Sequence, residues 1–196
     1  EIKDGAYHQK LRDDNCMAVV ADEFWKEEWT EYTFELKAQK LSGAEGFLIM
    51  FRLHGTLDPR GRVLRDLPPR MKSQQPRTEY WWNLGGWANV RSCVERWIDG
   101  VRIEQANTGH IIDTGKWYKI KIENTGDGYT LYLDDAKIAD VKDADVKGGR
   151  VGLATWQTEA LFDDVVVYGP KGALAVSASG KIPYKWGLIK STYTAK

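Results

Sequence analysis

The residues with the clearest capacity for chemistry lie in one aromatic stretch, Tyr80-Trp-Trp-Asn-Leu-Gly-Gly-Trp-Ala-Asn89. On a strand, alternate side chains point to opposite faces, so Trp81 and Asn83 share one face and Trp82 lies on the other. An indole ring stacks on the apolar face of a sugar ring, and an amide bonds sugar hydroxyls. The stretch therefore predicts a surface for a neutral sugar, made by Trp81, Asn83, Trp87, Asn89 and Arg91.

A second interpretation of the same residues is packing, in which the tryptophan rings only fill the interior. Gly85-Gly86 is first a turn signal, so the strand is expected to break there. Trp87 then belongs to the neighbouring strand and still lies close to Trp81. The two interpretations stay open at this stage, because a large aromatic ring suits both a core and a ligand surface.

A pair of carboxylates is the main catalytic alternative. Sandwich-fold glycosidases use two acids about 5 to 10 Å apart, and Glu95 and Glu104 both lie in strand-like stretches. That pair would have to converge in one cleft, and at least one member would need a raised pKa. The sequence contains no ExDxE cluster, GxSxG elbow, HExxH or Walker loop, and its histidines have no metal-ligand spacing. This alternative makes the chain itself a glycosidase or lyase.

The elements that must position these residues are predicted to be strands. Apolar and polar residues alternate from Tyr32 to Ala38, and Gly46–Leu53 is almost entirely apolar, as expected of a central strand covered on both faces. Further strand-like runs are Trp117–Glu123, Tyr129–Leu133, Arg150–Trp156 and Ala160–Tyr168, with a hairpin turn at Asn124–Gly128 and another at Asp134-Asp135-Ala136. No dozen residues keep a helical period, so the predicted fold is an all-β sandwich of two antiparallel sheets.

The periodicity also predicts which side chains fill the space between the two sheets. They are Phe34, Leu36, Phe47, Ile49, Phe51, Ile120, Ile122, Leu131, Leu133, Val165 and Val167. Residues 1–168 are expected to form this domain, residues 54–79 a long Pro/Arg-rich surface loop, and residues 169–196 a basic linker or docked extension. Because that loop leads into Tyr80 and Trp81, we expect it to contribute to the rim of the binding surface or to a protein contact.

Composition narrows the classes of partner. The chain has 28 Lys and Arg against 28 Asp and Glu, and a zero net charge argues against nucleic acid or an anionic membrane surface as the main partner. No apolar run approaches the roughly 18 residues needed to span a bilayer. Cys16 and Cys93 are favoured as two free thiols on strands over a long-range disulfide. The chain opens at Glu1 without Met or a signal-type segment, which suggests a processed protein or a fragment.

Several separated blocks of the sequence resemble the concanavalin A-like jelly-roll module found within family 51 α-L-arabinofuranosidases. These blocks are Leu41–Ile49, Tyr80–Trp87 with Glu95, Trp117–Ile122 and Tyr132–Asp134, of which Trp-Trp-Asn-Leu-Gly-Gly-Trp is the specific part. The opening Asp4–Gln9 and the closing Phe162–Tyr168 are similar to the first and last strands of lectin-like modules in general. The tail from residue 169 does not resemble the catalytic barrel that accompanies the module.

This resemblance implies a non-catalytic, carbohydrate-binding domain of a plant-polysaccharide-degrading hydrolase. The implied partners are a hemicellulosic or pectic cell-wall polysaccharide and the catalytic domain of the parent enzyme, and the implied location is extracellular or periplasmic. A third hypothesis is an interaction domain that docks on a catalytic partner without binding sugar; an apolar patch with no groove would favour it.

Similar jelly-roll modules often hold a structural calcium ion, with an Asp of the last strand and groups near the first strand as ligands. Hard oxygen ligands suit this ion. The resemblance therefore implies Ca²⁺ bound by Asp163 or Asp164 together with Asp4 and Asp22, and with Glu23 as a further candidate. The alternative is an acidic strand end that is simply solvated.

Overall fold

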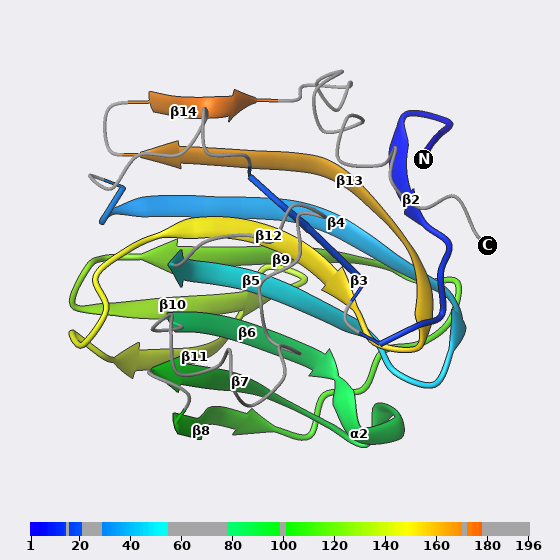
Figure 1. Ribbon diagram of the computed structural model, residues 1–196, viewed down its shortest axis with the longest axis horizontal. Coiled ribbons are helices and arrows are strands. Elements are labelled where there is room, and N and C mark those ends of the chain that lie inside the picture. Colours follow the sequence, from blue (N-terminus) through cyan, green and yellow to red (C-terminus); the bar gives the residue numbers. More distant parts are fainter. Residues whose placement is uncertain (15, 21–28, 55–77, 99–100, 170–171, 178–196) are drawn as a thin grey trace, which may run out of the picture.

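The computed structural model describes residues 1–14, 16–20, 29–54, 78–98, 101–169 and 172–177. Within these ranges the chain forms two β-sheets, and every pair of neighbouring strands is antiparallel. The predicted all-β jelly-roll sandwich is confirmed (Figure 1). No helix in the described ranges is long and apolar enough to cross a membrane.

The larger sheet has the strand order β1-β2-β13-β4-β9-β10-β11, and β14 also pairs with β13. Its strands are β1 (Ile2–Lys3), β2 (Ala6–Gln9), β4 (Tyr32–Gly43), β9 (Trp117–Asn124), β10 (Gly128–Leu133), β11 (Ala136–Lys142), β13 (Thr158–Gly169) and β14 (Gly172–Ser177). The pairing of β14 with β13 shows that the beginning of the predicted tail adds a strand to this sheet.

The smaller sheet has the order β3-β12-β5-β6-β7-β8 and carries the aromatic stretch at its centre. Its strands are β3 (Cys16–Val19), β5 (Phe47–His54), β6 (Thr78–Gly85), β7 (Arg91–Ile98), β8 (Val101–Thr108) and β12 (Arg150–Thr155). A short left-handed turn, labelled α2 (Gly86–Asn89), joins β6 to β7. The predicted Pro/Arg loop falls mainly on residues 55–77, which lie outside the described residues.

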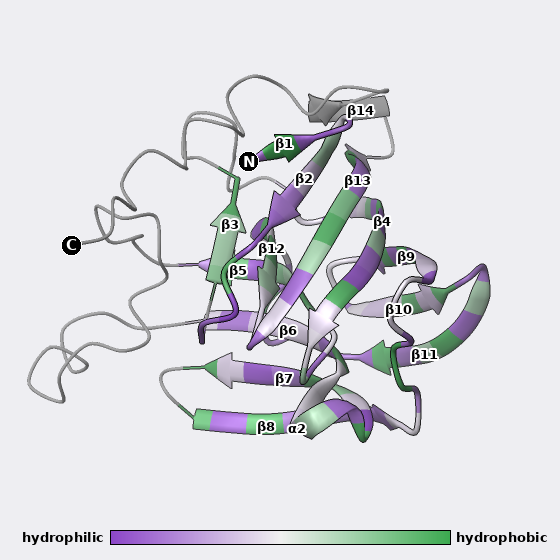
Figure 2. Cartoon of the chain, turned by 90° about the vertical axis from the view of Figure 1, so that its right-hand side faces the viewer, coloured by the Kyte–Doolittle hydropathy of each residue, from purple (hydrophilic) through white to green (hydrophobic). Residues whose placement is uncertain are grey.

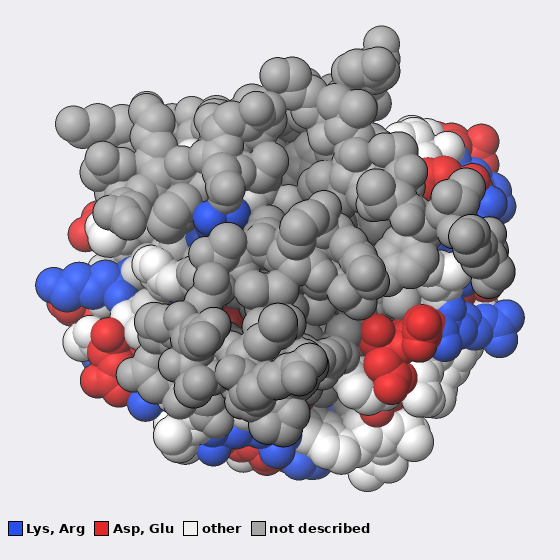
Figure 3. All heavy atoms as spheres, viewed as in Figure 1, with Lys and Arg blue, Asp and Glu red and all other residues white. Residues whose placement is uncertain are grey.

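The core between the sheets consists of the residues that the two-residue period predicts. All of the predicted core residues are buried, the most exposed being Leu133 at 6%. Buried and less buried residues alternate along most of β13, as expected of a strand with one face in the core. Figure 2 shows that this strand contains both hydrophobic and hydrophilic residues. Charged side chains of both signs lie close together around the rim of the face in Figure 3.

A second apolar cluster covers the outer face of the smaller sheet. It comprises Val19, Leu48, Met50, Leu53, Trp81 and Ala154, with Met17 and Trp156 packed against it. This outer apolar cluster explains why β5 is apolar at almost every position: Phe47, Ile49 and Phe51 pack into the core, while Leu48 and Met50 pack outward. The expectation of a central strand covered on both faces is confirmed.

The turn between β10 and β11 is formed by two aspartates in a left-handed conformation. Asp134 and Asp135 have φ values of 50° and 66°, a left-handed conformation that twists with the flanking strands and that short polar side chains tolerate best. Asp134 also pairs with Lys116 at 3.0 Å, and Asp135 pairs with Lys119 at 2.7 Å. The predicted hairpin at this position is confirmed.

A fully buried arginine ties the two sheets together at one end of the core. Arg52 is 0% exposed, and its guanidinium donates to Asn124 Oδ1 at 2.6 Å and to the carbonyl oxygens of Asp143 and Gly128, both at 2.8 Å. The same group lies 5.3 Å from the ring centre of Tyr80 and 5.4 Å from that of Tyr129.

The buried carboxylate of Asp143 adds further hydrogen bonds to those of Arg52. Asp143 Oδ2 accepts hydrogen bonds from Tyr80, Arg96 and Gln105 at 3.1, 2.9 and 3.0 Å. We call Arg52, Asn124 and Asp143, with these donors, the inner network. Its polar groups are paired within the protein, as a buried ionic cluster requires.

Both cysteines are free, as favoured from the sequence. Cys16 is half-buried on β3, whereas Cys93 on β7 is 0% exposed. Burial raises the pKa of the Cys93 thiol to about 12. A thiol in that state is a packing group with little thiolate at neutral pH.

Candidate functional site

The aromatic stretch divides between the two faces of β6 as predicted. Tyr80 and Trp82 belong to the main core, whereas Trp81 belongs to the outer apolar cluster. In the register of β6 with β7, Trp81 lies opposite Glu95, and in the register of β7 with β8, Glu95 lies opposite Glu104. Three neighbouring strands thus bring one tryptophan and two glutamates to the same outer face.

The double glycine at the end of β6 allows the chain to fold back over Asn83. Gly85 has φ 67°, and Trp87–Asn89 follow in the left-handed region at 52°, 58° and 64°. A Cβ atom on Gly86 would lie 2.5 Å from Asn83 Oδ1, so no larger residue fits there without displacing the amide. The turn signal read from Gly85-Gly86 is therefore a left-handed turn that places Trp87 beside the outer face.

Asn89 fixes this turn from within. Its side-chain amide donates to the carbonyl of Ile112 at 2.9 Å and accepts the N–H of Ile112 at 2.8 Å. Gly85 N–H donates to Ser92 Oγ at 2.9 Å, on the first part of β7. Asn89 was predicted to bond a sugar, but in the structure both ends of its amide bond the backbone.

Arg91 connects the turn to β8. Its guanidinium carbon lies 3.7 Å from the ring centre of Trp87, which is stacking distance. The two terminal nitrogens donate to the two carboxylate oxygens of Glu104 at 2.7 and 3.0 Å. This fork geometry fixes both the arginine and the carboxylate.

Arg102 extends the same chain of contacts across the strands. It donates from Nε to Glu95 Oε2 and from a terminal nitrogen to Glu104 Oε1, both at 2.7 Å. The amide of Asn83 donates to the other oxygen of Glu95 at 3.0 Å. We call Asn83, Arg91, Glu95, Arg102 and Glu104, with the ring of Trp87, the outer network.

The outer network is half open to solvent. The side chains of Arg91 and Arg102 are each 35% exposed and that of Glu104 is 26% exposed, while Glu95 is almost buried at 9%. The hydrogen bonds from Arg91 lower the pKa of Glu104, so its carboxylate is ionised at neutral pH. Two carboxylates and two guanidiniums therefore present charge-balanced acceptors and donors side by side.

This electrostatic arrangement does not suit the predicted catalytic pair. A general acid needs a raised pKa so that it carries a proton near the working pH. The pKa of Glu104 is shifted in the opposite direction, and Glu95 is held by Arg102 and Asn83. The geometry is that of a fixed hydrogen-bonding surface.

The structure brings Asn83, Trp87 and Arg91 of the predicted surface into one network. Trp81 is 1% exposed and packs in the adjoining apolar cluster. Arg102 was not predicted, although the Arg102-Ile-Glu104 alternation places it on the same strand face as Glu104. The sequence thus indicated the face on which Arg102 lies, but only the register of β8 against β7 shows that Glu95 is its partner.

The described members of the predicted calcium set do not form an ion site. Asp163 and Asp164 lie at an irregularity of β13, and Asp164 pairs with Lys37 Nζ at 2.7 Å. Asp4 lies in the exposed turn between β1 and β2, and Asp22 is outside the described residues. In the described ranges no three His, Cys, Asp or Glu side chains gather as metal ligands. Calcium binding stays a prediction, because Asp22 and Glu23 lie outside the described residues.

Two known proteins are similar in sequence to this chain. The chain is 34% identical over 134 residues to an extracellular exo-α-L-arabinofuranosidase of Streptomyces chartreusis, covering 68% of this chain and 13% of that protein. It is 39% identical over 54 residues to a levanase of Bacillus subtilis strain 168, covering 28% of this chain and 8% of the levanase. The chain therefore spans a small part of the curated relatives it matches. No family model matches.

One solved structure with the same fold is the carbohydrate-binding module CBM66 from Bacillus subtilis. It superposes with a TM-score of 0.53 and 18% identity, over 83% of this chain and 91% of that one. The chain has a jelly-roll fold. The resemblance drawn from its aromatic stretch is confirmed, and the module is related in sequence to segments of two glycoside hydrolases.

Proposed function

We propose that this module is a non-catalytic carbohydrate-binding domain of a larger glycoside hydrolase, and that the outer network is its binding surface. The observation that carries the proposal is the fixed, half-exposed arrangement of Arg91, Arg102 and Glu104 beside the ring of Trp87. Sequence similarity to an arabinofuranosidase and a levanase supports it. The extracellular relative supports a role outside the cell, where the module would hold the parent enzyme on its substrate.

The charge balance of the surface points to a neutral sugar. Adjacent guanidinium donors and carboxylate acceptors match neighbouring hydroxyl groups, each of which both donates and accepts. An acidic glycan would meet Glu95 and Glu104 as well as the arginines, so repulsion would offset the attraction. We therefore propose that the ligand is a neutral part of a hemicellulosic or pectic polysaccharide, with arabinose side chains as the first candidate. Fructan is the glycan to compare with it, because one relative is a levanase.

A binding panel with a matched pair of tryptophan variants tests this function. Calorimetric titrations would compare arabinoxylan, arabinan, xyloglucan, cellulose and levan, with product analysis on the same samples. Trp87→Ala should weaken binding by about 1–3 kcal/mol, the value of one stacked aromatic in a binding site. Trp117→Ala is the control, because Trp117 is 40% exposed on β9 of the larger sheet, away from the outer network.

Four outcomes would contradict the proposal. Equal losses for both tryptophan variants would show a nonspecific effect on the protein. Binding that survives Trp87→Ala unchanged would place the site elsewhere. Released products would favour the alternative of a glycosidase or lyase, and no binding to any glycan in the panel would favour a domain that only docks on its catalytic partner.

A further inference from the structure

We propose that Glu45 is a positioning residue that holds the Trp87 turn in its left-handed conformation. This inference rests on the proposed function for its consequence, because the turn presents Trp87 to the glycan. Glu45 lies in the connection between β4 and β5, whereas the turn lies between β6 and β7. The contact between them joins two connections that are far apart in the sequence.

The turn needs external support because its backbone is costly. Trp87–Asn89 have φ values of 52°, 58° and 64°, a region where the Cβ atom of an L-residue crowds the following carbonyl. Such conformations persist only where the surrounding structure over-determines them. Asn89 supplies part of that support through Ile112, which lies in the connection between β8 and β9.

Glu45 supplies support to the backbone N–H groups of the turn. Its Oε1 accepts the N–H of Ala88 at 3.3 Å. The carboxylate of Glu45 thus reaches the backbone of the turn, so a side chain from another connection of the same protein supports it.

The backbone of Glu45 is itself anchored in the sandwich. Its N–H donates to Thr158 Oγ1 at 3.1 Å, and the same hydroxyl donates to its carbonyl oxygen at 2.7 Å. Thr158 is 0% exposed, and the adjacent Gly46 N–H donates to the carbonyl of Gly85 at 3.0 Å. The carboxylate therefore reaches the turn from a fixed position.

The role of Glu45 depends on its acceptor oxygen more than on its charge. Burial raises its pKa, and the nearby carboxylates of Glu95 and Asp14 act in the same direction, against the N–H groups of Ala88 and Trp87. Lys40 is a cation that interacts electrostatically with Glu45. A neutral acceptor of the same length should thus replace it, whereas a shorter carboxylate should not.

The experiment compares Glu45→Gln, Glu45→Asp and Glu45→Ala in the full chain. Glutamine keeps an acceptor oxygen at the same distance from the turn. Aspartate keeps the charge, but its shorter side chain places the carboxylate farther from the turn, and alanine removes both the acceptor and the charge. Glu123→Ala is the control, because Glu123 bonds Lys121 and Tyr132 on the outer face of the larger sheet. The first readout is the 19F NMR resonance of 5-fluorotryptophan at position 87, assigned with Trp87→Phe, and the second is affinity for the glycan that the unaltered chain binds.

Alanine and aspartate should shift or broaden the Trp87 resonance and weaken glycan binding at least fivefold, while glutamine and the control stay within twofold. An unchanged resonance in Glu45→Asp and Glu45→Ala would overturn the proposal, as would a glutamine variant as impaired as alanine. If Glu45→Ala does not fold, the aspartate and glutamine pair decides. If the unaltered chain binds no glycan, the proposed function fails, and the resonance alone decides whether Glu45 positions Trp87.

Discussion

The inner and outer networks use the same chemistry on opposite sides of the smaller sheet. Each pairs arginines with carboxylates beside aromatic rings: Arg52 lies against Tyr80 and Tyr129, and Arg91 lies against Trp87. They differ in solvent access, since Arg52 is 0% exposed and Arg91 is 35% exposed. Removing one partner from a sealed network leaves a buried charge unpaired, while water replaces a lost partner in an open one.

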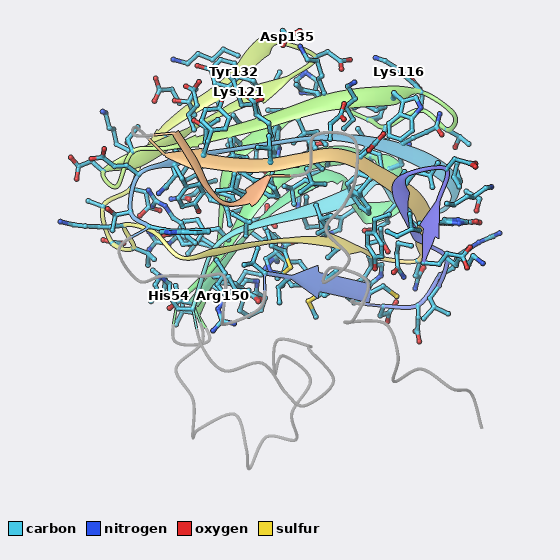
Figure 4. All side chains as sticks on the ribbon, turned by 90° about the horizontal axis from the view of Figure 1, so that it is seen from above. His54, Lys116, Lys121, Tyr132, Asp135 and Arg150 are labelled. Carbon is cyan, nitrogen blue, oxygen red and sulfur yellow. The ribbon has the colours of Figure 1, made fainter. Side chains whose placement is uncertain are left out.

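Access to solvent therefore separates a structural role from a binding role more clearly than residue type does. The inner network is not available to a ligand, because Arg52 and Asp143 form their hydrogen bonds with protein groups. The outer network keeps arginine and carboxylate surface in contact with water. Figure 4 shows that a third polar group, Lys121 with Tyr132, lies on the far side of the larger sheet from His54 and Arg150.

The largest effect expected from this comparison is on stability. Arg52→Leu removes the donor to Asn124 and to two buried carbonyls, and should lower the free energy of unfolding by about 3–5 kcal/mol. Arg91→Leu, in the outer network, should cost about 1 kcal/mol or less. Urea denaturation of both variants measures the difference, and equal costs would refute the distinction between the networks.

Gly86→Ala tests whether the turn holds Asn83 in place in the outer network. The added Cβ would meet the Asn83 amide at 2.5 Å, so the side chain must move away from Glu95. We expect a loss of about 1–3 kcal/mol in stability, as for other overpacked sites. Gly109→Ala is the control, because a Cβ there meets nothing within 4 Å. A stable Gly86→Ala protein with unchanged glycan affinity would show that Asn83 is not fixed by this contact.

The inner network should also make stability depend on pH in the acid range. Burial acts to raise the pKa of Asp143, but hydrogen bonds from Arg96, Gln105 and Tyr80 outweigh it and hold the pKa below its usual 3.8. A depressed folded pKa adds stability above the unfolded value, and that stability is lost as the pH falls through the folded value. Urea midpoints of the unaltered chain and Asp143→Asn should converge below about pH 4. A constant difference from pH 6 to pH 3 would contradict this assignment.

The smallest effect on folding, and a clear one on binding, is expected for Arg102→Ala. Its ion pairs with Glu95 and Glu104 are partly exposed, so the free energy of unfolding should change by about 1 kcal/mol or less. Glycan affinity should fall, because the donors between the two carboxylates are lost. Lys137→Ala, which breaks a comparable surface pair with Asp140, should change neither quantity. A parallel loss of affinity in Lys137→Ala would remove the outer network as the site.

The sequence alone determined the features that depend on neighbouring residues. Alternation with a period of two assigned the core face of β4 and β9, and it separated Trp81 from Trp82 on β6. The Asp134-Asp135 turn followed from the left-handed preference of short polar residues. Such local patterns are readable because strand geometry and turn chemistry act over two to four residues.

The tertiary structure alone decided what those faces meet. The burial of Trp81, the use of Asn89 by Ile112 and the contact of Glu45 with Ala88 all join segments that the sequence keeps apart. The register of β7 with β8 also places Arg102 in contact with both Glu95 and Glu104, the pair kept as a catalytic alternative. Pairing across strands is long-range, so neither the partner of a side chain nor its access to water follows from spacing along the chain.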